Sequence, residues 1–219
     1  MAQCKLLIVC LVFLLSTGFN KFPSKTPESP SPSQLRQYYD SGKYNQEIET
    51  KLNDAKEYLD RQLQVARPGR LAIVLDIDET CLSNYRDLER MTFSTDPQAL
   101  TAVYMMGNAE AIAPMLSLYK HAIDHKVAVF FISERPNMPE IVTTTIKNLK
   151  QAGFDQWEEL LLKPVDKKDL TAADFKTNAR KNIASRGFDI VLNIGDQSAD
   201  LQGGYSEAKV KIPNPFYGA

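Results

Sequence analysis

The chain has 219 residues, of which 43% are hydrophobic and 24% are charged, and its formal net charge is −1. This length suits one α/β domain of good size, and the composition is that of a globular protein. Since this net charge gives no electrostatic indication of nucleic-acid binding, we expect no nucleic-acid polymer as a partner.

The first residues have the pattern of a signal peptide. Lys5 precedes ten apolar residues at 6–15, and small residues follow at 16–18. A bilayer span needs roughly 20 apolar residues, so a permanent transmembrane helix is the weaker interpretation. We therefore expect residues 1–18 to be a signal peptide, the protein to be exported (periplasmic or secreted), and no stable membrane span to remain after processing.

A flexible linker is predicted next, over residues 19–33. Lys21–Ser33 contains four prolines and four serines with few apolar residues that could pack. The folded domain is then expected over residues 34–219. It should begin with a helix over about 33–63, where apolar residues recur mostly at three- and four-residue steps from Tyr44 onward.

An apolar run then leads directly into two carboxylates. Leu71–Leu75 is typical of a buried strand, and Asp76 and Asp78 follow it. Ligands of open α/β sheets bind beyond the carboxyl ends of such strands. Two close carboxylates repel each other, and a bound Mg²⁺, which prefers hard oxygen ligands, is the simplest relief. For an Asp-x-Asp pattern taken alone, a solvated turn is the competing interpretation.

A small helical insert is expected over about 84–109. This stretch has no clean period, carries a turn signal at Asp96–Pro97, and is rich in aromatic and sulfur-containing side chains. We place it over the site, although such side chains suit a core equally well.

The remaining elements alternate between helices and strands. Helices are expected over 114–125, 139–151 and 171–185, and strands over 127–132, 159–162, 189–194 and 209–212. Such alternation predicts an α/β fold with a parallel sheet covered by helices.

Polar residues follow three of these strands at one edge of the sheet. Asp76 and Asp78 follow the first buried strand, Ser133 the second, and Asp196 and Asp200 the third. A cation, Lys176, lies between the last two strands. Arg180, one helical turn later, is its rival for the cation site, although a surface ion pair is the favoured role for Arg180. The pattern predicts one crevice that gathers these groups.

These motifs, in this order, resemble the haloacid dehalogenase (HAD) superfamily, in particular its class B (subfamily IIIB) acid phosphatases. The resemblance covers roughly residues 71–217 and is carried by Asp76-x-Asp78-x-Thr80, Ser133, Lys176 and Gly195-Asp196-x-x-x-Asp200. It implies a HAD-like Rossmannoid parallel sheet sandwiched by helices, with a small helical cap insert between the first and second motifs. One residue departs from the pattern, because Glu134 stands before Arg135 where the family commonly has Gly.

The resemblance also implies an exported, Mg²⁺-dependent acid phosphatase that hydrolyses small phosphomonoesters, with nucleotides among the candidates. Asp76 would be the nucleophile that forms an aspartyl-phosphate, and Asp78 the general acid and base. The implied assignments are Mg²⁺ binding by Asp76, the backbone carbonyl of Asp78 and Asp196; substrate binding by Ser133, Lys176 and Thr80; and support by Asp200 and Arg180. If nucleotides are the preferred substrates, the aromatic side chains of the insert that could stack on the base are Tyr85, Phe93 and Tyr104.

Two alternatives remain open at this point. The same intermediate would serve a phosphotransferase that passes the phosphoryl group to an alcohol instead of water. A non-catalytic storage or phosphate-binding relative is the alternative from a different class of protein.

Overall fold

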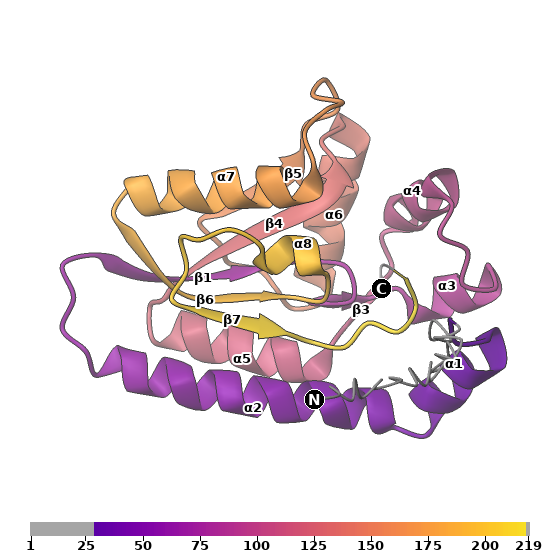
Figure 1. The fold of residues 1–219 in the computed structure, drawn as a ribbon, viewed down its shortest axis with the longest axis horizontal. Helices are drawn as coiled ribbons and strands as arrows, with labels where there is room; N and C mark the ends of the chain where they lie inside the picture. Colours follow the sequence, from indigo (N-terminus) through magenta and orange to yellow (C-terminus); the bar gives the residue numbers. More distant parts are fainter. Residues whose placement is uncertain (1–28, 218–219) are drawn as a thin grey trace, which may run out of the picture.

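The structure is a computed structural model that describes residues 29–217, so the predicted signal peptide and most of the predicted linker lie outside the described residues. At its centre is a five-stranded parallel sheet in the order β5–β4–β1–β6–β7 (Figure 1). The strands are β1 (Arg70–Leu75), β4 (Ala128–Pro136), β5 (Glu159–Lys163), β6 (Phe188–Gly195) and β7 (Ala208–Lys211). The predicted α/β fold with a parallel sheet is confirmed.

Helices cover both faces of the sheet. Helix α7 (Ala172–Ser185) lies on one face, and α2 (Lys43–Leu63) and α5 (Ala113–Asp124) lie on the other (Figure 1). Successive residues of β1 pack into different cores, because Val74 contacts the small core beneath α7 whereas Leu75 belongs to the larger core on the opposite face. Burial on both faces is why this strand is a continuous apolar run in the sequence.

The register of the central strands brings their carboxyl ends together. Leu75, the last residue of β1, lies opposite Phe131 of β4 and Ile194 of β6. The residues that follow these positions therefore emerge at the same edge of the sheet.

The helix predicted over residues 33–63 is two helices. It divides into α1 (Pro32–Asp40) and α2 at Gly42, whose φ of 77° is a conformation that glycine adopts without strain. The predicted linker was also too long at its end. Ser31 accepts a hydrogen bond from the backbone N–H of Gln34, and this capping box makes residues 31–33 the start of α1.

Residues 82–111, here called the cap, lie between β1 and α5. They contain α3 (Tyr85–Arg90) and α4 (Pro97–Met106), as the helical insert was predicted to do. The ends of the cap pair as an antiparallel ribbon of β2 (Leu82–Ser83) and β3 (Glu110–Ala111), which has no counterpart in the prediction. Helix α4 packs on α6 (Pro139–Gln151), and Asn148 of α6 exchanges hydrogen bonds of 3.1 and 2.7 Å with the backbone of Ala109.

An aromatic cluster joins the cap to the rest of the domain. The Tyr85 ring stacks on Tyr39 of α1 with 3.5 Å between ring centres, and Phe93 stacks on Phe216 at 5.7 Å. Both cap rings are buried, with 5% and 8% of their surfaces exposed. The expectation that Tyr85 and Phe93 stack on a substrate is therefore wrong, because their faces are already covered.

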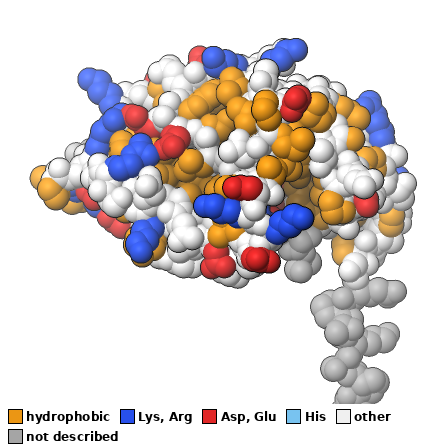
Figure 2. Space-filling view, turned by 90° about the horizontal axis from the view of Figure 1, so that it is seen from above, with side chains coloured by type: hydrophobic (Ala, Val, Ile, Leu, Met, Phe, Trp, Pro, Cys, Tyr) orange, Lys and Arg blue, Asp and Glu red, His pale blue; other side chains and the backbone are white. Residues whose placement is uncertain are grey.

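The face that carries α7 shows no large area of a single charge sign in its described part. Apolar side chains gather across its middle, with positive and negative side chains interspersed around them (Figure 2). Among the described residues, no helix combines the length and apolar character needed to cross a bilayer.

Candidate active site

A pocket of about 260 Å³ lies at the carboxyl edge of the sheet, beneath the cap. Its walls include six of the residues predicted from strand ends and spacing, namely Asp76, Asp78, Ser133, Lys176, Asp196 and Asp200. The cap contributes Leu100 and Tyr104 to the same pocket. The six predicted residues, up to 124 positions apart in the chain, thus share one crevice, as the three strand ends predicted.

A larger cavity of about 630 Å³ lies between α2 and residues 211–215. Of the carboxylates just named, only Asp196 reaches it, and neither Asp76 nor Lys176 lines it. The candidate active site is therefore the smaller pocket.

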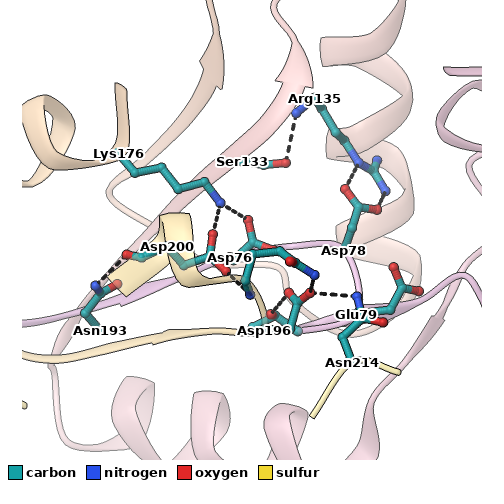
Figure 3. A network of polar contacts seen from close by, with 12 residues as sticks. Asp76, Asp78, Glu79, Ser133, Arg135, Lys176, Asn193, Asp196, Asp200 and Asn214 are labelled. Atoms are coloured by element: carbon teal, nitrogen blue, oxygen red, sulfur yellow. Dashed lines mark hydrogen bonds and ion pairs between the residues drawn. The ribbon is translucent and has the colours of Figure 1, made fainter. Parts of the chain in front are cut away.

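Asp76 is fixed at the end of β1 and faces a buried ammonium group. Its backbone N–H donates to the carbonyl of Ile194 at 3.0 Å, which continues the pairing of β1 with β6. Lys176, on the buried face of α7, donates from Nζ to Asp76 Oδ1 at 2.5 Å and also to Asp200 (Figure 3). A buried ammonium between two carboxylates offsets part of their mutual repulsion.

Asp196 is held by side chains from three parts of the chain. Thr80 donates to its Oδ1 at 2.8 Å, and Gln197 and Asn214 donate to its Oδ2 at 2.7 and 2.8 Å. Thr80 is fully buried and does not line the pocket. Its predicted contact with substrate is thus corrected to a contact that positions Asp196.

Asp200 lies in the short helix α8 (Ser198–Leu201), close beneath Gly195. Its Oδ2 accepts the backbone N–H of Gln197 at 2.7 Å, and its Oδ1 accepts from Lys176. A Cβ at position 195 would lie about 2.3 Å from the Asp200 side chain, so glycine is required at this close approach. The predicted role of Asp200 in orienting Lys176 agrees with this geometry.

Asp78 points away from the other carboxylates, toward Arg135 (Figure 3). Arg135 Nε donates to Oδ2 at 2.9 Å, and Arg135 Nη2 and Asn84 Nδ2 each donate to Oδ1 at 2.7 Å. From the sequence, Arg135 was named only as the residue that follows Glu134, and no role was predicted for it. The one signal available was that it stands two residues after Ser133 in the strand that ends at the site.

Arg180 does not form the surface ion pair that was favoured for it. It is fully buried and donates to the backbone carbonyls of Asp200 at 2.7 Å and Gly204 at 3.1 Å, and also to that of Gln202. The physical reason is that the chain after α8 turns back over α7, which brings three backbone carbonyls within reach of the guanidinium. Arg180 therefore supports the loop that carries Asp200 and takes no place in the pocket.

Glu79 is a further buried acid that the sequence-based prediction omitted. It adopts a φ of 52°, and its carboxylate accepts from the backbone N–H of Asn84 at 2.7 Å and from the Tyr217 hydroxyl. Burial, with Asp78 as the next contribution, raises the pKa of Glu79 to about 8. No local pattern indicates this contact, because Glu79 and Tyr217 are 138 residues apart.

The donor set fits a hard divalent cation. Oxygen atoms of Asp76, Asp196 and Asp200 all lie within 4.8 Å of one another, and all three residues are buried. Asp200 thus joins Asp76 and Asp196 in this group, whereas the side chain of Asp78 is occupied by Arg135 and the predicted ligand there is its backbone carbonyl. A set made only of carboxylate oxygens matches the preference of Mg²⁺ rather than that of a softer metal.

Burial is the largest cause of the raised pKa values of Asp76 and Asp196, and neighbouring charges add to or oppose it. Burial raises the pKa of Asp76 well above its usual range; Lys176 opposes this effect, and Asp200 and Asp196 add to it. Burial likewise raises the pKa of Asp196, with Asp200 adding to the rise and hydrogen bonds from Asn214 and Thr80 opposing it. Although burial lowers the pKa of Lys176, Asp76 and Asp200 outweigh it and the pKa is raised overall. A bound dication would favour the ionised carboxylates.

The family of the chain follows from comparison with known proteins. The family model described as HAD superfamily, subfamily IIIB (acid phosphatase) matches residues 2–219. The chain belongs to this family. It is therefore a HAD-type acid phosphatase, an enzyme whose family acts on small phosphate esters, and both the resemblance and the enzyme class predicted from the motifs are confirmed.

Individual relatives agree with this assignment. Acid phosphatase 1 of Solanum lycopersicum is 32% identical over 209 residues, which cover 94% of this chain and 80% of that protein. The crystal structure of a class C acid phosphatase from Bacillus anthracis with tungstate bound has a TM-score of 0.72 at 26% identity, covering 87% of each chain. Vegetative storage protein 1 of Arabidopsis thaliana is 33% identical over 148 residues, which cover 66% of this chain and 54% of that protein.

Proposed function

We propose that this acid phosphatase is an exported, Mg²⁺-dependent enzyme that hydrolyses small phosphomonoesters through an aspartyl-phosphate at Asp76. The observation that supports this most directly is the meeting of Asp76, Ser133, Lys176 and the carboxylates of Asp196 and Asp200 in one pocket. Its volume of about 260 Å³ suits a phosphoryl group with a small leaving group.

In the first step, an Asp76 carboxylate oxygen attacks phosphorus as the bond from phosphorus to the leaving oxygen breaks. The departing alkoxide takes a proton from the carboxyl group of Asp78. Ser133 and Lys176 hold the remaining phosphoryl oxygens and stabilise their charge in the transition state.

In the second step, water attacks phosphorus of the aspartyl-phosphate. Asp78, now a carboxylate, takes a proton from that water, and the bond from phosphorus to Asp76 breaks, which releases inorganic phosphate. Mg²⁺ bound to Asp76, Asp196 and Asp200, or to the backbone carbonyl of Asp78, would supply positive charge that lets an anionic carboxylate approach a phosphate dianion. Thr80 and Asp200 keep the acids of the pocket in place.

The substitution Asp76→Asn tests the nucleophile. The variant should lose at least about 1,000-fold in hydrolysis of p-nitrophenyl phosphate, because an amide cannot form the intermediate, yet it should fold. Phosphate release in the presence of Mg²⁺ and circular dichroism measure the two properties. Asp169→Asn, at an exposed position outside the pocket, is the matched control and should retain full activity. Wild-type activity in Asp76→Asn would rule out this nucleophile.

The alternatives give different results in the same assay. A phosphotransferase would produce a phosphorylated alcohol when an alcohol is added, whereas a hydrolase would release only inorganic phosphate. The storage alternative, raised by relatives such as vegetative storage protein 1, requires that the wild-type protein hydrolyse no phosphomonoester with Mg²⁺ present.

A further inference from the structure

Arg135 is a buried cation that stands outside the steps described so far. Only 1% of its surface is exposed, and a buried charge is costly unless it is paired and hydrogen-bonded. Its Nε and Nη2 both bond to the Asp78 carboxylate, and its Nη1 donates to Thr145 Oγ1 of α6 at 3.0 Å. The planar guanidinium thus uses its edge to fix the plane of one carboxylate.

The face of the same guanidinium is covered by the cap. The centre of the Tyr104 ring, on α4, lies 4.7 Å from Cζ of Arg135, the central carbon of the guanidinium. This distance is that of a cation–π contact. Tyr104 and Asp78 both line the pocket. Arg135 does not line it, but it contacts both of these side chains and so links the cap to the Asp78 carboxylate.

The carboxylate that Arg135 orients has little freedom of its own. Asp78 Oδ1 also accepts from Asn84 at the beginning of α3, so Asp78 is held by the cap on one side and by β4 on the other. Its accepted hydrogen bonds fix where a proton on Asp78 would point. The cap end of this arrangement is itself fastened to α6 by the bonds between Asn148 and Ala109.

We propose that Arg135 positions Asp78 for proton transfer and that Tyr104 of the cap positions Arg135, so that the geometry of the acid depends on where the cap lies. This inference rests on the proposed role of Asp78 as general acid. Neither Arg135 nor Tyr104 needs to touch the reacting atoms, because both act through the position of the Asp78 carboxylate.

The proposal predicts an effect that depends on the leaving group. An alkoxide leaves poorly without a proton, so hydrolysis of an alkyl phosphate needs a well-placed acid. A dinitrophenolate is a stable anion and leaves without help. A misplaced Asp78 should therefore slow the first substrate and spare the second, whereas general damage to the site should slow both equally.

The test compares kcat/KM for an alkyl phosphate and for 2,4-dinitrophenyl phosphate in the full-length protein with Mg²⁺. Arg135→Lys keeps the charge and loses the planar fork, so it should lower the alkyl phosphate value about 100-fold and the dinitrophenyl value less than about threefold. Tyr104→Leu should shift the ratio in the same direction by roughly fivefold, and Tyr104→Phe, which keeps the ring face, should retain the wild-type ratio.

Arg86→Lys is the matched control, because Arg86 is an exposed cap arginine that pairs with Glu110 at 2.9 Å and does not line the pocket. Both of its kcat/KM values should equal those of the wild type. If Arg135→Lys fails to fold, Tyr104→Leu at the less buried end of the link decides the question.

An equal loss on both substrates, or no loss, in folded Arg135→Lys or Tyr104→Leu would overturn the proposal. A wild-type protein without phosphatase activity would instead contradict the proposed function. A third measurement separates direct from indirect action, since Arg135→Lys should cause no further change in the ratio when Asp78 is already Asn. A further change there would also overturn the proposal.

Discussion

Single residues set the chemistry of this pocket through the partners that each of them keeps. Asp196 has all three of its side-chain bonds to neutral donors, whereas Asp78 faces a guanidinium and Asp76 an ammonium. Carboxylates of identical structure thereby acquire different tasks, because their surroundings differ in charge and in the direction of hydrogen bonds.

Glu134, the departure from the family pattern, lines the pocket and is exposed at its mouth. Its negative charge should disfavour esters whose leaving group carries a second anionic group. We expect Glu134→Gln to raise kcat/KM for a substrate with an extra carboxylate or phosphate about threefold relative to p-nitrophenyl phosphate, the size of an exposed charge interaction. Steady-state kinetics in low salt measure this ratio.

Glu140→Gln removes a charge that is exposed on α6 but does not line the pocket, so it should leave the ratio unchanged. A Glu134→Gln enzyme with the wild-type ratio would show that this side chain does not select substrates by charge.

At this scale the sequence was most informative where a polar residue follows a strand end, and Lys176 of α7 was the one site residue predicted from a helix that lines the pocket. Asp76, Ser133 and Asp196 could be predicted because each comes directly after an apolar run. The contacts of Asn214 with Asp196 and of Tyr217 with Glu79 could not, since both partners come from a segment without regular structure that lies 18 and 138 residues away in the chain.

Elements differ in how far their own sequence determines them. Strands β1, β5, β6 and β7 and helix α6 lie within one residue of their expected bounds, because apolar runs and Pro139 at the first helical turn are local signals. Strand β4 instead continues four residues beyond its predicted end at residue 132. The ribbon of β2 and β3 has two residues in each strand, too few for any period to show. The division between α1 and α2 depends on the conformation of one glycine, which the apolar pattern does not report.

The contact of α7 with the loop after α8 leads to a prediction for Arg180. Arg180→Met should lower the free energy of unfolding by about 2 kcal/mol, because the carbonyls of Asp200, Gln202 and Gly204 lose the hydrogen bonds donated by this fully buried guanidinium. Activity should fall by roughly tenfold as Asp200 loses its fixed position. Urea denaturation and phosphate release measure these changes.

Lys181→Met changes the exposed neighbour of Arg180 and should affect neither quantity. Equal stability of Arg180→Met and the wild type would contradict the role assigned to this buried guanidinium.

The molecule as a whole buries several carboxyl groups close together at one edge of its sheet, among them Asp76, Glu79 and Asp196. In the absence of metal, Asp76, Glu79 and Asp196 all have raised pKa values in the folded state. Each therefore keeps a proton at pH values where the unfolded chain has lost it. The stability that these groups contribute is present at acidic pH and is lost as the pH rises.

For Glu79 the relevant window extends from the ordinary pKa of 4.5 to about 8. With a chelator present, the free energy of unfolding should be higher at about pH 5 than at about pH 8, and Glu79→Gln should reduce the difference by about 2 kcal/mol. Added Mg²⁺ should stabilise the protein more at the higher pH, because its ligands must be deprotonated. Urea titrations at both pH values check these expectations, and a metal-free protein that is more stable at about pH 8 would contradict them.

The wide separation of the pocket residues along the chain has a consequence for biosynthesis. A nascent chain that has left the ribosome only as far as β4 carries Asp76 and Ser133, but neither Lys176 nor Asp196, and Asn214 is made later still. If these residues act as proposed, a partly translated molecule cannot cleave phosphate esters, and activity begins only when translation has passed the last strand.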